Sequence, residues 1–374
     1  MENQSQCVLK RLEQIEAFDA LAPEWDALLA SATIENIFLT HAWLREWWRI
    51  YGATCELWTL TLRQAQTLVG VAPLVWARAS DGTRYVRWMG DGEITPNHLD
   101  WLVHPDFRAE FARALGVYLW QHRAAWDILD LDNITQDSPM RDLVNEALQS
   151  YGLTVQSHVT EVCPYAALPA TFEAYLQARG SKSRKHLRYS QRVLLRDFPN
   201  ARYGRAETAA EVDAVFDALA HLHQARWTRR GEAGSFASEQ FAVFHRAMAQ
   251  QGLRLGYLRL YFIKIDQAYV AVYYCYRVGN RMIYYNAGFD ERWAKYSVGI
   301  LLLAHTLEQA CVTGATEYDF LQGEEEYKSH WATDTHTNWC LRVASPSVRA
   351  RWAWFRRYQV KQIRKSLKRL LQRG

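Results

Sequence analysis

The chain has 374 residues, of which 49% are hydrophobic and 22% are charged. This length favours two domains, and the composition excludes disordered, collagen-like and coiled-coil proteins. The longest apolar stretch, residues 68–77, contains a proline and is too short for a bilayer-spanning helix, which needs about 20 residues. The net charge of +4 conceals a basic C-terminus, because residues 347–374 hold ten Lys and Arg and no acid.

The first half of the chain alternates helical and strand-like patterns. Residues 23–51 are expected to be helical, with Thr40 as an N-cap. Turn signals such as Asp81-Gly82 then separate strand-like runs, which predict an antiparallel meander. The expected elements are strands over 57–62, 68–77, 85–89 and 99–103, a helix over 107–125, a strand over 127–131, a helix over 140–151 and a strand over 154–162.

The second half repeats this order of elements. The pattern predicts helices over 172–195, 209–230 and 238–250, a short strand over 201–204, strands over 253–265, 268–278 and 281–287, a helix over 299–312 and a strand over 317–321. Helices followed by three strands, a helix and a strand therefore occur in both halves. We expect a topological repeat of two α/β domains.

The sequence contains only weak motifs for binding a metal, a nucleotide or another ligand. The six cysteines are scattered without a Cys-x-x-Cys pair, so neither a disulfide framework nor a metal site is expected. Residues 1–6 lack the features of a signal peptide, which predicts a cytoplasmic protein. The loop 289–298 leads into a helix through Ser297 and Gly299 and is a candidate anion cradle. Gly-x-Gly-x-x-Gly and Gly-x-x-x-x-Gly-Lys-Ser/Thr motifs are missing, and Ser297 is equally typical of an ordinary N-cap.

Three runs carry a resemblance to a known family: Tyr-Tyr-Asn-Ala-Gly-Phe-Asp (284–290), Ala-Lys-Tyr-Ser-Val-Gly (294–299) and the segment 318–331. Over about residues 170–335, including the helix with His-Gln-Ala-Arg-Trp (223–227), the chain resembles the GNAT acyltransferases. It looks most like the BioF2-like branch, with its CelD/BcsL-type acetyltransferases, which is related to the FemAB peptidyltransferases. The loop keeps Gly299 alone of the glycines that usually form the GNAT loop.

The resemblance implies an α/β fold of two tandem GNAT-like domains, each a mixed, mainly antiparallel sheet flanked by helices. The expected boundaries are 1–165 for the N-terminal domain, 166–345 for the C-terminal acyltransferase domain and 346–374 for a basic amphipathic helix. An acetyl-CoA or other acyl-CoA co-substrate, without a metal, would be held by residues of the second domain: Asn286, Gly288, Tyr296, Ser297, Val298 and Gly299. A strand N–H near 286–288 would stabilise the oxyanion.

Catalysis requires a group that takes a proton from the acceptor. The candidates at the end of the last strand are Asp319, Glu324, Glu325 and His330, with Glu325 preferred from its motif position. Tyr327 is a candidate acid, Lys328 a candidate phosphate or carboxylate binder, and His223 a further candidate on its helix. Each assignment has an alternative that stays open. Consecutive glutamates are typical of a solvated loop, Tyr327 is equally suited to a core contact, and His223 is equally suited to a structural role with a hydrogen bond. The acids near residues 91–100 are either an acceptor groove or solvated loops.

These features predict a GNAT-type N- or O-acyltransferase that moves an acyl group to an amine or hydroxyl of a cell-envelope or polysaccharide precursor, with a saccharide or peptide-like acceptor. One alternative is a FemAB-like aminoacyl transfer from aminoacyl-tRNA, the one case in which nucleic acid is a partner. The other is a non-catalytic accessory protein of polysaccharide biosynthesis. The basic run 179–196 is either an exposed linker helix or a phosphate contact. The C-terminal helix either packs on the body or contacts an anionic membrane or nucleic acid.

Overall fold

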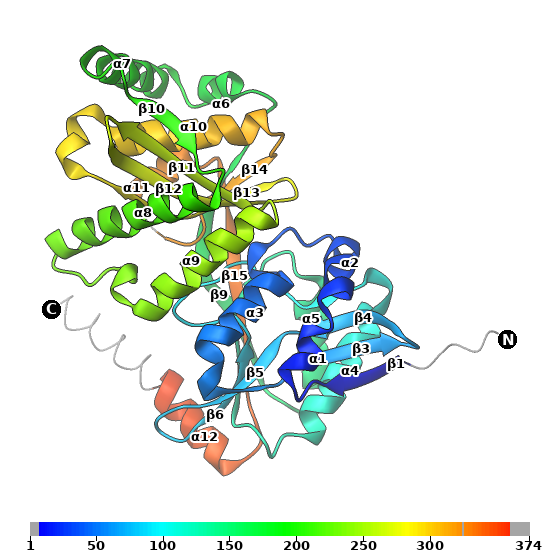
Figure 1. Cartoon of the computed structure of the whole chain (residues 1–374). Coiled ribbons are helices and arrows are strands. Elements are labelled where there is room, and N and C mark those ends of the chain that lie inside the picture. The colour runs from blue at the N-terminus through cyan, green and yellow to red at the C-terminus, as the bar shows by residue number, and fades with distance from the viewer. Residues whose placement is uncertain (1–6, 324, 360–374) are drawn as a thin grey trace, which may run out of the picture. The chain divides into compact units, whose positions relative to one another are not determined.

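Figure 1 shows the computed structural model, which describes residues 7–323 and 325–359. The described residues form two compact units: unit 1 comprises 7–34, 38–161 and 337–359, and unit 2 comprises 35–37, 162–323 and 325–336. The expected boundary at 165/166 falls at 161/162. Residues 337–345, expected in the second domain, belong to unit 1 because their strand pairs there.

Unit 1 contains two sheets and the helices that cover them. Its elements are β1 (Cys7–Arg11), α1 (Ile15–Asp19), α2 (Ala22–Ala32), α3 (His41–Tyr51), β2 (Cys55–Leu57), β3 (Leu60–Gln64), β4 (Thr67–Ala72), β5 (Leu74–Arg78), β6 (Arg84–Trp88), β7 (Leu102–Val103), α4 (Arg108–Gln121), β8 (Ile128–Thr135), α5 (Pro139–Gln149) and α12 (Val348–Trp354). Strands β1, β3, β4 and β7 form one antiparallel sheet. In the second sheet β2, β5 and β6 are antiparallel, whereas β6 and β8 are parallel. The expected simple meander is therefore divided between two sheets.

Unit 2 is a sheet with helices on both faces. Its elements are α6 (Phe172–Ala178), α7 (Ser181–Asp197), β10 (Arg202–Arg205), α8 (Ala209–Arg229), α9 (Glu239–Arg254), β11 (Leu258–Ile265), β12 (Ala268–Val278), β13 (Arg281–Phe289), α10 (Val298–Val312), β14 (Glu317–Asp319) and α11 (Glu326–Trp331). Strands β10 to β13 are antiparallel, and β13 is parallel to β14. In Figure 1, α10 lies on one face of β11–β13 and α8 on the other.

Both units contain a parallel strand pair next to antiparallel strands, and two strands cross the boundary between the units. In each unit a parallel pair joined through a helix, β6–β8 or β13–β14, follows antiparallel strands. The remaining strands, β9 (Val155–Ala167) and β15 (Asp334–Ala344), each begin in one unit and end in the other. The end of β9 pairs with β14 of unit 2, and the end of β15 pairs with β8 of unit 1. The expected α/β class with two domains of mixed, mainly antiparallel sheets is confirmed.

Several expected elements have different bounds in the structure. The helix expected over 172–195 is two helices, because Gly180 adopts φ +92° between them. The strand expected over 68–77 is divided into β4 and β5 at Pro73, which lacks an N–H for the ladder. Helix α9 extends to Arg254, so that β11 begins only at Leu258. Strands β1 and β15 were not expected.

The core explains most of the aromatic and cysteine residues. Trp25, Trp43 and Trp47 are fully buried in unit 1, and the Thr40 side chain accepts the Trp43 N–H as the expected N-cap. All six cysteines are free thiols, and four are buried. Within the described ranges, no helix is long and apolar enough to cross a bilayer.

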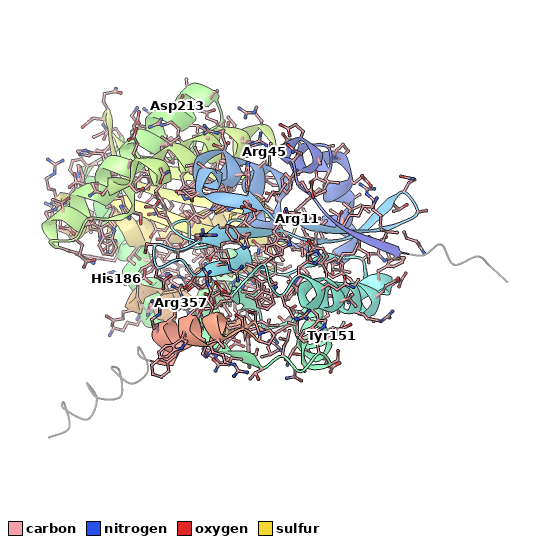
Figure 2. The ribbon with its side chains drawn as sticks, turned by 90° about the horizontal axis from the view of Figure 1, so that it is seen from below. Arg11, Arg45, Tyr151, His186, Asp213 and Arg357 are labelled. Carbon is pink, nitrogen blue, oxygen red and sulfur yellow. The ribbon has the colours of Figure 1, made fainter. Side chains whose placement is uncertain are left out.

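The described start of the basic C-terminus packs on unit 1. Ala350 and Ala353 are buried, and Arg349 forms an ion pair with the buried Asp127 at 3.1 Å. Arg357, labelled in Figure 2, stacks on the Tyr85 ring at 5.0 Å, and the Tyr358 hydroxyl donates to Asp130 at 2.7 Å. Residues 348–358 thus follow the interpretation in which the basic C-terminal helix packs on the body of the protein. The remainder of the expected helix, 360–374, lies outside the described residues.

Candidate functional site

The site of unit 2 begins where β13 and β14 separate. These parallel strands pair only at Arg281–Glu317, Met282–Tyr318 and Ile283–Asp319. Strand β13 continues to Phe289 and there pairs only with β12 among the described strands. Its backbone edge over residues 284–289 is therefore open on the β14 side.

A β-bulge determines which side chains face this opening. The register of β12 and β13 shifts between Tyr274 and Cys275, so that Tyr285 is the extra residue. Directly opposed residues share a face of the sheet. Tyr284, Ala287 and Phe289 therefore lie on the α10 face, together with Tyr273.

Helix α10 starts beside the opening. Its N-cap, Ser297, adopts the left-handed conformation with φ +56°, and its side chain forms no capping hydrogen bond, in contrast to the ordinary N-cap that its spacing indicates. The first turn contains no acidic residue. Because N–H groups of a first helical turn lack intrahelical acceptors, this end of α10 is electropositive and able to bind an anion.

A cavity of about 330 Å³ joins these features. Its lining residues come from α8, β12, β13, the turn before α10, α10 itself and α11: Arg226, Tyr273, Tyr284, Ala287, Phe289, Ala294, Ser297, Val298, Gly299, Ile300 and Tyr327. The Tyr327 hydroxyl donates to the Tyr284 hydroxyl at 3.1 Å. Burial raises the pKa of both phenols, so both remain protonated at neutral pH.

The segment after β14 holds the acid and base candidates. Lys328 is 4% exposed; its Nζ donates to the Gln322 carbonyl at 2.6 Å and lies 3.0 Å from the Glu325 carboxylate. Gly323 precedes this pair with φ +133°, a conformation that favours glycine, and an added Cβ would lie 2.2 Å from the Glu325 carboxylate. The Glu325 side chain is half exposed and does not line the cavity, but its charge contributes to the raised pKa of Tyr327. Glu324 lies outside the described residues.

Asp319, His223 and His330 have other surroundings. Asp319 is fully buried, and its Oδ1 accepts the Leu321 N–H at 2.8 Å, which fixes the turn after β14. His223 accepts the Trp227 indole N–H at 2.8 Å, and burial together with the nearby Arg226 charge lowers its pKa to about 4. This arrangement favours a structural role for His223. His330 is exposed and contacts the Ser183 hydroxyl.

Of the expected donor-binding residues, Ser297, Val298 and Gly299 line the cavity. A Cβ at Gly299 would lie 3.2 Å from Phe289, so glycine allows this ring to pack beside the helix start. Asn286 and Gly288 lie on the opposite face of β13, with Tyr274 and Val272.

Tyr296 lines a second, more open cavity of about 870 Å³ beside the same loop. That cavity is also lined by His221, Arg229, Arg292 and Lys295.

Sequence reasoning gave no role to the cavity's other polar side chains, Arg226, Tyr273 and Tyr284. Arg226 belongs to the quoted run 223–227, but only the fold brings it to the end of β13. In unit 1, His98 and Asp100 are buried rather than solvated. Across the described chain, no group of three or more His, Cys, Asp or Glu side chains could hold a metal ion.

Comparison with known families now adds to this geometry. The model of the acetyltransferase (GNAT) domain matches residues 181–329, which contain the open strand, α10 and the start of α11. This match supports the resemblance to the GNAT acyltransferases over that part of the chain. No curated protein matches the sequence.

Solved structures support the same fold. The chain is similar to FemX, with a TM-score of 0.62 and 10% identity over 85% of this chain and 95% of FemX. It is also similar to the C-terminal domain of a putative lysylphosphatidylglycerol synthetase from Agrobacterium fabrum, with a TM-score of 0.53 and 8% identity over 90% and 96% of the two chains. At these identities the likeness establishes the fold alone. The expected fold of two α/β domains is thus supported, and the match to a GNAT domain covers residues 181–329.

Proposed function

We propose that unit 2 transfers an acyl group from acyl-CoA to an amine or hydroxyl, with a saccharide or peptide-like precursor of the cell envelope as acceptor. The observation that carries this proposal is the open edge of β13 beyond Ile283, which meets the start of α10 in one cavity. A linear thioester donor needs such an open edge for its amide groups and an electropositive helix end for its phosphates. The acceptor class rests on the sequence resemblance.

The residues present fit this donor. Val298 and Gly299 open the electropositive end of α10 to a pyrophosphate, and the uncovered edge over 284–289 offers N–H and C=O groups to the pantetheine arm. Lys295, on the loop before α10, lines the neighbouring larger cavity and supplies a cation for further phosphate charge. Acyl-CoA supplies a thioester, whose C–S bond breaks as the new C–N or C–O bond forms.

The chain's own groups handle the protons of this reaction. A strand N–H near 286–288 stabilises the developing oxyanion. Glu325 takes the proton that the acceptor loses, and Tyr327, kept neutral by burial, donates a proton to the departing sulfur of coenzyme A. Lys328 holds the Glu325 carboxylate in place. Asp319 supports the turn that carries both, and His223 supports the contact of α8 with β13.

Calorimetric titration with acetyl-CoA tests the donor. Gly299→Glu places a negative charge in the cradle, where repulsion at 4 Å amounts to about 1 kcal/mol in water and about 4 kcal/mol in a partly buried site. We expect the affinity to fall at least about tenfold. Val312→Glu is the matched control, because it adds the same charge at an exposed position at the other end of α10. Equal affinities for both variants would contradict the proposed cradle.

A second donor, aminoacyl-tRNA, is favoured by the likeness to FemX and by the basic surface of α7. On this helix Arg184 and Arg188 pair with Glu173, whereas the exposed Lys182, Lys185 and Arg192 form no ion pair with a described residue. Absence of acetyl-CoA binding together with loss of transfer activity on RNase treatment would support this donor.

A further inference from the structure

Arg226 is the charged residue of the cavity, and it lies on a different element from the expected acyl-CoA contacts. It is half-buried near the C-terminal end of α8, the helix that lies on the face of the sheet opposite α10. Its guanidinium carbon lies 4.9 Å from the centre of the Phe289 ring, in a cation–π contact. The positive charge of Arg226 also acts on Tyr273 and Tyr327. It partly counteracts the rise in pKa that burial causes in both phenols.

The charge of Arg226 is not balanced within the protein. Its buried Nε has no hydrogen-bond partner, and no carboxylate among residues 7–323 and 325–359 forms an ion pair with it. Nearby arginines differ in this respect: Arg229 lies 3.4 Å from Glu291, and Arg292 lies 2.7 Å from Asp290. A half-buried guanidinium without an acidic partner costs free energy in the empty cavity. An anionic ligand that enters the cavity regains that cost.

The position of Arg226 favours the acceptor over the donor as that ligand. The Phe289 ring contacts the start of α10 through Gly299 and also contacts the guanidinium of Arg226. The proposed phosphate site lies at the start of α10, whereas Arg226 lines the same cavity as the tyrosines from a different helix, α8. Guanidinium groups bind carboxylates and phosphates through paired hydrogen bonds.

We propose that Arg226 binds a carboxylate or phosphate group of the acyl acceptor and thereby positions its nucleophile at the tyrosine hydroxyls of the cavity. This inference rests on the proposed acyl transfer, and it narrows the acceptor class to amines or alcohols that carry an anionic group near the nucleophile. Neutral sugars and simple amines are then poor acceptors.

Protection of Arg226 from phenylglyoxal, read by mass spectrometry of the unmodified protein saturated with coenzyme A, tests the inference without a mutation. We expect Arg226 to react in the coenzyme A complex and to be protected by added inorganic phosphate or acetate, whereas the exposed Arg230 stays reactive. Protection by phosphate alone indicates a phosphorylated acceptor, and protection by acetate alone a carboxylate. Protection by coenzyme A itself, or by neither anion, would overturn the inference.

Calorimetry of Arg226→Gln separates this site from the donor site. We expect its affinity for coenzyme A to remain within about twofold of the wild type, with Arg230→Gln as the control, because one charged hydrogen bond contributes about tenfold or more where it exists. A tenfold loss in a folded Arg226→Gln variant would assign Arg226 to the donor and refute the inference. Arg226→Lys serves the same comparison if the glutamine variant does not fold. No binding of coenzyme A to the wild type would refute the proposed function itself, which is a distinguishable outcome.

Discussion

The close contact of α8 with β13 makes a specific prediction for Gly288→Ala. A Cβ at this position would lie 2.8 Å from the backbone nitrogen of His223, 2.8 Å from Cβ of Leu222 and 3.0 Å from the carbonyl oxygen of Leu219. Ordinary carbon contacts are about 3.5–4.0 Å, so α8 must move away from the sheet. Two of the three atoms belong to the helix backbone, which cannot yield by a side-chain rotation.

Overpacking of this kind lowers the free energy of unfolding by about 1–3 kcal/mol. Replacing glycine offsets a small part of this loss, because alanine has less backbone entropy in the unfolded chain. For a unit of this size, the loss corresponds to a fall in Tm of about 2–10 °C in scanning calorimetry. Gly252→Ala on α9 is the matched control, because its added Cβ meets Tyr276 only at 3.3 Å and alanine is the better helix former. A Gly288→Ala protein as stable as Gly252→Ala would refute the contact.

Three further predictions concern the proposed chemistry and the pH dependence. Tyr327→Phe should lower kcat about 100-fold or more in a thiol-release assay while the Kd for acetyl-CoA stays unchanged; unchanged kcat would exclude Tyr327 as the acid. Glu325→Gln should lower kcat similarly, whereas the neighbouring exposed Glu326→Gln should not; equal effects would count against Glu325 as the base. Burial raises the pKa of Asp100 to about 7, so the folded state favours the neutral carboxyl. The contribution of Asp100 to the free energy of unfolding is therefore lost as the pH rises. From pH 5 to pH 8 this loss is about 3 kcal/mol, and Asp100→Asn should remove it from denaturant unfolding curves. An unchanged pH dependence in that variant would contradict the raised pKa of this carboxyl.

Local patterns predicted those parts of the fold that depend on neighbouring residues. Strand β12 has its expected bounds, and α10 begins within one residue of its expected start, because apolar periodicity and turn residues specify both. The loop before α10 was identified as a candidate cradle, and Val298 and Gly299 do line the cavity.

Features that depend on contacts between distant parts of the chain could not be predicted from local sequence patterns. Strand β15 was missed because part of its pairing lies with β8, a strand far away in the chain. Arg226 belongs to a recognised run, but its place beside Phe289 depends on how the end of α8 meets β13. Ser297 has the spacing of an N-cap, whereas its left-handed conformation follows from the preceding turn Glu291–Tyr296.

The central claim is that the open strand and the start of α10 bind an acyl-CoA. Calorimetric titration of the wild-type protein with acetyl-CoA, alongside Gly299→Glu and Val312→Glu, tests it most directly. The account predicts one site per chain that persists in Val312→Glu and weakens at least about tenfold in Gly299→Glu. No binding by the wild type, or equal binding by both variants, would contradict it.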